Sequence, residues 1–229
     1  MEITYLFIFT VIIIVWFAIY GACVGFLRLF LYLIGLVLSI VLMVKCTPYV
    51  SDFLIQNTPI QNTVETYVRE VFTAGYDDNG NEDEAIENME LPDIAKNLII
   101  SNNTDEVYKQ LLVEKFADYV AKYISKLLIN ILAFLVCVIL INMLYRFLLA
   151  AFEVVDRIPI INGLNRLSGF LAGIVQGLLI LELIYLAMIA FSGTEWGSKL
   201  YEMAGKNMIT AYLYENNLLL MVISSLVLL

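Results

Sequence analysis

The residue types that carry most acid–base and metal chemistry are scarce in this 229-residue chain. It has no histidine, which excludes Ser-His-Asp and Cys-His nucleophile pairs, imidazole proton relays and imidazole metal ligands. Its three cysteines, Cys23, Cys46 and Cys137, are far apart and lack the C-x-x-C spacing of a zinc or iron–sulfur site. We therefore expect no catalytic residue, no metal site and no cofactor.

Two charged side chains form the candidate polar site, because each is the only charge in a long apolar segment: Glu182 and Arg28. An unpaired carboxylate at membrane depth costs about 2.5–3.5 kcal/mol on insertion scales, so Glu182 needs a partner. The candidate partners are Arg28, Asn130 or Asn142, water, or a second protomer. Glu182 is then either a proton- or ion-coupled site or complex contact, or a structural carboxylate that is protonated or paired. Arg28 is nearer to a helix end, from which it can reach the membrane interface.

The composition explains why these charges stand out. Apolar side chains make up 61% of the sequence, against about 45–50% in an average soluble domain. A soluble domain of this length buries only about 70% of the surface that its unfolded chain exposes. It has no room to hide so much apolar surface, so the composition excludes a soluble monomer.

Four apolar segments are long enough to cross the roughly 30 Å hydrocarbon core of a membrane as helices. One helix over residues 3–44 would be about 63 Å long, so the chain must turn back, and Gly21–Gly25 is the expected place. We predict spans at 3–20, 26–44, 127–145 and 167–191. The expected fold class is all-α: an integral membrane protein with four transmembrane helices and a helical polar insertion between spans two and three. The expected parts are a transmembrane hairpin at 1–44, a polar, acidic insertion at 45–126, a second transmembrane hairpin at 127–191, and an amphipathic and apolar tail at 192–229.

The polar insertion carries −8 of the net charge of −9. Its pattern predicts short helices at 63–72 and 91–100, on either side of a solvated acidic loop at 77–90. Thr104 is expected to cap a further helix that runs straight towards the third span. The apolar residues 218–229 are too few to cross a membrane, so they re-enter it, lie in its interface or pack on the bundle.

Three glycines in the fourth span, Gly169, Gly173 and Gly177, follow one another in steps of four. Such steps keep residues on one stripe of a helix, and the missing side chains allow a neighbouring backbone to approach closely. We predict that this stripe packs against another helix. Helix geometry places Glu182 roughly 180° around the helix from the centre of the stripe.

The connection into the fourth span holds the most specific pattern of the sequence. Pro159, Asn162 and the pair Asn165-Arg166 lead into the stepped glycines. This pattern resembles the CvpA (colicin V production protein) family. Leu91-Pro92 before the third span and residues 212–217 near the end resemble its longer Gram-positive branch. Gly25-Phe26 followed by Arg28 also resembles the opening of the family's second span.

The resemblance has two departures and a clear functional implication. Val24 stands where the family has a basic residue, and Leu29 stands where it has an acidic one. The resemblance implies a non-enzymatic component of the bacterial cytoplasmic (inner) membrane that supports production or secretion of colicin V or another bacteriocin toxin. In such a protein the stepped glycines would hold the bundle, while Asp156, Pro159 and Arg166 would order the turn before them.

The expected partners are the lipid bilayer and either other membrane or secretion proteins or a second copy of the chain, and no nucleic acid. The alternative function is a small channel or transporter subunit in which Glu182 lines a polar path. Charge does not decide the topology. Arginines cluster at one end of the spans and lysines occur in comparable number at the other: Arg28, Arg146, Arg157 and Arg166 against Lys45, Lys115, Lys122, Lys126, Lys199 and Lys206.

Overall fold

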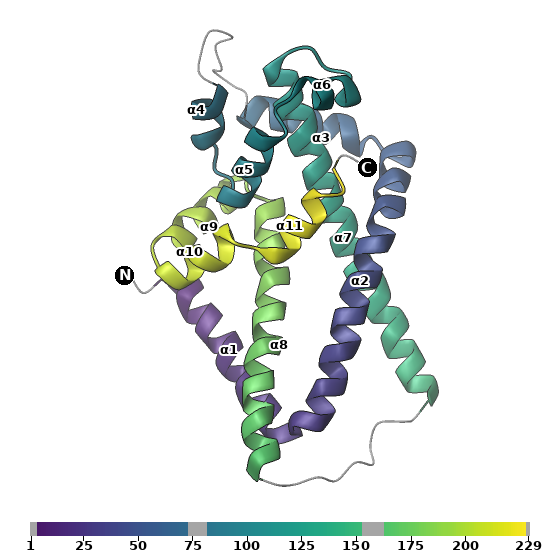
Figure 1. Cartoon of the computed structure of the whole chain (residues 1–229), viewed down its shortest axis with the longest axis vertical. Coiled ribbons are helices and arrows are strands. Elements are labelled where there is room, and N and C mark those ends of the chain that lie inside the picture. Colours follow the sequence, from purple (N-terminus) through teal and green to yellow (C-terminus); the bar gives the residue numbers. More distant parts are fainter. Residues whose placement is uncertain (1–3, 73–81, 153–162, 228–229) are drawn as a thin grey trace.

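The protein was analysed as a computed structural model, which describes residues 4–72, 82–152 and 163–227. These residues form eleven helices and no strand. Figure 1 shows the longest helices running roughly along the long axis of the molecule, with one group of short helices at one end and another about half-way along it. Four are long and apolar enough to cross a membrane: α1 (Tyr5–Val24), α2 (Phe26–Asn57), α7 (Phe116–Phe152) and α8 (Gly163–Ala190). The expected all-α architecture with four candidate membrane-spanning helices is confirmed.

The first two long helices form a hairpin that turns at Gly25. Its φ of 84° lies in the left-handed region, which glycine adopts without the steric cost that a side chain adds. Helix α2 then continues past Lys45 and Pro48, well beyond the end predicted at residue 44. The sequence pattern missed this extension because polar residues begin there. In the structure, Thr47 on the extension is buried and donates to the carbonyl of Met43 at 2.8 Å.

Short helices form the polar end of the molecule: α3 (Ile60–Phe72), α4 (Glu82–Glu87), α5 (Asp93–Ser101) and α6 (Asp105–Leu111). Helix α4 lies inside the segment predicted as an acidic loop, so that prediction is wrong for its described part. Thr104 caps α6 as expected, but the helix does not run on into the third span. It ends at Leu112, whose φ of 54° is left-handed, and α7 begins at Phe116.

Helix α7 carries much of the core. The half of α7 that lies at the polar end of the molecule packs against the short helices there. Its fully buried aromatic and aliphatic side chains include Tyr119, Tyr123 and Ile124. An ion pair of 2.7 Å between Arg69 and Asp118 joins α3 to the first turn of α7. This half of the molecule therefore has a packed interior. By contrast, many side chains on α1 and the first part of α2 are exposed and apolar, as lipid-facing helices require.

The tail folds back over the long helices as α9 (Glu195–Gly205), α10 (Met208–Glu215) and α11 (Leu218–Ser224). Figure 1 shows α9 and α10 beside the start of α1, and α11 crossing α8. Leu220 and Ile223 of α11 are fully buried, whereas Leu218 and Met221 are exposed. Of the three possibilities for residues 218–229, the described part thus packs on the bundle with one apolar face left open.

Candidate functional site

The stepped glycines of α8 lie against α1. A Cβ atom on Gly173 would overlap the carbonyl oxygen of Phe17 and come within 3.0 Å of the Cα of Ala18. A Cβ on Gly169 would overlap the carbonyl oxygen of Gly21, which is itself packed against α8. Gly177 has more room, with its nearest neighbour, the Cβ of Phe17, at 3.2 Å. The two backbones therefore touch over about one turn, from Gly169 to Gly173, where only glycine fits.

The turn residues of the family pattern are only partly described. Asp156 and Pro159 lie outside the described residues. Asn165 sits in the first turn of α8, where its side-chain amide occupies the space beside Gly25. Arg166, one residue further, is exposed. The described part of this motif therefore brings the start of α8 to the turn of the first hairpin.

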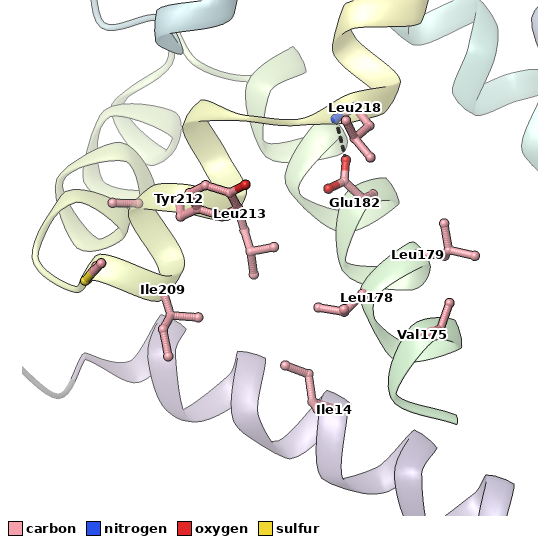
Figure 2. A pocket seen from close by; sticks show the side chains of 11 residues that line it. Ile14, Val175, Leu178, Leu179, Glu182, Ile209, Tyr212, Leu213 and Leu218 are labelled. Atoms are coloured by element: carbon pink, nitrogen blue, oxygen red, sulfur yellow. Dashed lines mark hydrogen bonds between the residues drawn. The ribbon is translucent and has the colours of Figure 1, made fainter. Parts of the chain in front are cut away.

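Glu182 lies further along α8, and a helix end supplies its partner. The backbone N–H of Leu218, at the start of α11, donates to its carboxylate at 2.7 Å. Asn217, the N-cap of that helix, is fully buried and donates through its side chain to the backbone carbonyl of Glu182 at 2.9 Å. The Asn217 side chain also accepts from the N–H of Leu220 at 2.8 Å. The hydrogen bonds from Leu218 and Asn217 thus fasten α11 to α8, and Figure 2 shows the one from Leu218 to Glu182.

The partner found within the described chain is none of the three side chains predicted for Glu182, which were Arg28, Asn130 and Asn142. Arg28 lies at the hairpin turn and donates to the hydroxyl of Tyr32 at 3.1 Å. Because that turn contacts Asn165, and Glu182 is seventeen residues further along α8, Arg28 and Glu182 are separated by roughly 26 Å of helix. Asn142 donates to the carbonyl of Val138 instead. The two charges that the sequence grouped together are therefore separate features.

The sequence pattern did not reveal this partner, because it is a backbone N–H group and not a side chain. The available signal was the Asn216-Asn217 pair directly before an apolar run, which is typical of a helix N-cap. Helix N-termini carry unpaired N–H groups and a partial positive charge, and both favour a carboxylate. A capped helix placed at membrane depth was therefore a possible partner for Glu182.

A pocket of about 700 Å³ opens beside Glu182. Its walls come from α1, α8, α10 and the start of α11, and Figure 2 shows Glu182 at the α11 end, with Leu178 and Val175 further along α8 towards Ile14. The volume lies within the range of small-ligand sites. Among the described residues of the lining, Glu182 is the only charged one, and the hydroxyl of Tyr212 is the other strongly polar group.

A second carboxylate makes a similar contact outside the spans. Glu215, in the last turn of α10, accepts a hydrogen bond from the backbone N–H of Asp93, the first residue of α5. Burial raises the pKa of the Glu215 carboxyl, and the nearby Asp93 carboxylate raises it further, while the Asp93 N–H and Lys96 lower it. The tail is thus joined to α8 by Glu182 and to the polar end by Glu215.

The first half of α1 is joined to α8 by a buried hydrogen bond that the sequence did not indicate. The hydroxyls of Thr10 and Tyr185 are 2.9 Å apart, and both residues are fully buried. Thr10 also donates to the carbonyl of Leu6. Tyr185 stacks edge-on with Tyr214 of α10, with ring centroids 6.4 Å apart. These contacts therefore join α1, α8 and α10, the three helices that form most of the pocket wall.

Comparison with known families identifies the segment that builds these features. The family model described as Colicin V production protein matches residues 108–215. Over this segment, which is a little under half of the chain, the sequence is similar to that family. The match covers α7, α8, α9 and α10, and so includes the stepped glycines and Glu182. The similarity of the first hairpin to the family lies outside the matched residues. No curated protein and no solved structure matches the chain.

Proposed function

We propose that this protein is a non-enzymatic component of the bacterial cytoplasmic membrane that supports the production or secretion of a peptide toxin. The observation that carries the proposal is the family match over residues 108–215. The geometry of the matched segment suits a structural role, because its two partly buried carboxylates hold helices together. Glu182 and Glu215 both accept from backbone N–H groups at helix starts.

Complementation tests the proposed role. The chain is expressed in a colicin V-producing bacterium whose own family member has been deleted, and toxin is assayed in the medium and in the cells. We expect the parent chain to restore toxin in the medium, and Gly173→Leu to fail because it disrupts the bundle. Glu182→Gln should restore it, since the amide oxygen still accepts from Leu218. Failure of the parent chain at normal membrane levels would contradict the proposal.

A component of a larger assembly should also have partners. Affinity capture from native membranes in mild detergent is expected to retain a membrane or secretion protein at a fixed ratio. Thiol labelling would then determine the side of the polar helices. A cysteine placed at Glu87, which is exposed on α4, serves as the probe after Cys23, Cys46 and Cys137 are replaced by serine.

A small channel or transporter subunit is the second candidate, favoured by the position of Glu182 in a pocket walled by candidate spans. The apolar lining around it offers few ligands to a moving ion. Proton or ion flux into liposomes decides between the two functions. Flux that is lost in Glu182→Gln would support the transporter, and absence of flux from the parent chain would contradict it.

A further inference from the structure

The pocket beside Glu182 has the polarity of an amphiphile site. Its Glu182 end lies next to α11, whereas Val175, Leu178 and Ile14 line the part further along the spans (Figure 2). Helices α10 and α11 are too short to cross a membrane, and their exposed side chains include Ile209 and Met221. Short helices with an apolar face lie along the membrane interface. The polar end of the pocket is therefore on the interface side, and its apolar part faces the membrane interior.

The lining specifies the charge of an occupant. Glu182 has no basic residue beside it among the side chains that line the pocket. An ionised carboxylate offers about four acceptor positions. The backbone N–H groups of Leu218 and Leu219 hydrogen-bond to it, which leaves further positions for another donor. A carboxylate at the edge of an apolar pocket is stabilised by a paired cation, and no described side chain in the pocket supplies one.

The second polar group of the lining, the hydroxyl of Tyr212, can donate a hydrogen bond to an anionic oxygen. Tyr212 lies on α10, across the pocket from Glu182, and is 67% exposed at the pocket mouth. Its hydroxyl is a donor to an oxyanion. A ligand with a cationic donor, a neighbouring phosphate and an apolar chain matches Glu182, Tyr212 and the aliphatic lining in that order.

We propose that this pocket binds one phospholipid whose headgroup ends in a primary ammonium, phosphatidylethanolamine. The ammonium donates to the carboxylate of Glu182, a phosphate oxygen accepts from Tyr212, and an acyl chain lies along Leu178, Val175 and Ile14. This site is independent of the toxin-related role proposed above. Such a lipid would fill the space between α1 and α8 and fix the position of α10.

The experiment uses the full chain purified in mild detergent. Phosphatidylethanolamine, phosphatidylcholine and phosphatidylglycerol are added separately and as equal mixtures. Thermal unfolding reports stabilisation, and native mass spectrometry reports which lipid is retained. Phosphatidylcholine carries a cation without N–H donors, and phosphatidylglycerol has no cation, so the three lipids separate charge from hydrogen bonding. One charge-assisted hydrogen bond predicts about a tenfold preference for phosphatidylethanolamine over phosphatidylglycerol.

Three variants test whether the preference for phosphatidylethanolamine arises in this pocket. Glu182→Gln keeps an acceptor for Leu218 but loses the ion pair with the ammonium. It should therefore bind phosphatidylethanolamine and phosphatidylglycerol about equally. Leu178→Trp fills the pocket and should abolish retention of the lipid. The matched control is Leu171→Trp, seven residues earlier on the same face of α8, 58% exposed and outside the pocket lining. It should bind lipid as the parent does.

Each outcome bears on the proposal. Equal retention of the three lipids, or a preference that survives in Glu182→Gln, would overturn it, as would a preference for the anionic lipid. Retention that persists in Leu178→Trp would place the lipid elsewhere on the protein. If Glu182→Gln unfolds, the ranking of the three lipids on the parent and on Leu178→Trp still decides the question.

Discussion

Helix α8 contacts α1 in two different ways along its length. In its first half, glycines at steps of four bring the two backbones into contact, and no side chain separates them. In its second half, the helices are joined by the Thr10–Tyr185 hydrogen bond, and a pocket of about 700 Å³ lies beside Glu182. The family match includes both halves of α8. One pair of helices thus combines a close backbone contact with a hollow one, and the tail helices α10 and α11 complete the walls of the hollow part.

The largest effect is expected at the close contact. Gly173→Leu places a side chain where the carbonyl of Phe17 now lies, so α1 must move. Overpacking of this kind typically costs about 1–3 kcal/mol, and a clash with backbone belongs at the upper end. Thermal unfolding and size-exclusion profiles in mild detergent measure the loss. Gly163→Leu is the matched control, because a Cβ there meets nothing within 4 Å. Equal effects at both positions would contradict the close contact.

A smaller effect is expected where the tail is fastened to the hollow half. Asn217→Ala removes both the cap of α11 and the hydrogen bond to the carbonyl of Glu182. Loss of a buried cap and its second bond predicts about 2 kcal/mol of destabilisation. Hydrogen exchange should increase in α11 before it increases in α8. Asn216→Ala is the control, since Asn216 is exposed and bonds only locally to Tyr212 in the described structure. If exchange rose equally in α8, the tail would not be a separate unit.

The third prediction concerns the link between the tail and the polar end. The pKa of Glu215 is raised above its ordinary value of 4.5, chiefly by burial, so the folded protein binds this proton more readily than the unfolded chain. Its contribution to stability is therefore complete below pH 4.5 and decreases as the pH rises through the raised value. Glu215→Gln should remove this part of the dependence of the unfolding free energy on pH. Unfolding of parent and variant from pH 4 to 8 gives the difference, and parallel curves would contradict the assignment.

The sequence predicted the close contact better than the hollow one. Helix periodicity alone places Gly169, Gly173 and Gly177 on one stripe, because that pattern is local to a single helix. It also indicated that Glu182 points away from the stripe. The partner of Glu182 depends on how residues 195–224 fold back over α8, and no local pattern specifies that path. The extension of α2 to Asn57 was missed for a similar reason, since packing against other helices overrides the polar residues there.

The smallest effect is expected at Leu178, which lies on α8 beside the pocket and away from the glycine stripe. Its side chain is 37% exposed and lines the pocket, so Leu178→Ala enlarges a space that is already open. A buried leucine would leave a new cavity and cost about 2–5 kcal/mol, whereas a substitution at an open site changes stability by about 0.5 kcal/mol or less. The unfolding temperature should therefore stay close to that of the parent, in contrast to Gly173→Leu five residues earlier. A loss as large as that of Gly173→Leu would mean that α1 and α8 are closely packed along their whole length, and that the pocket is not open in the membrane.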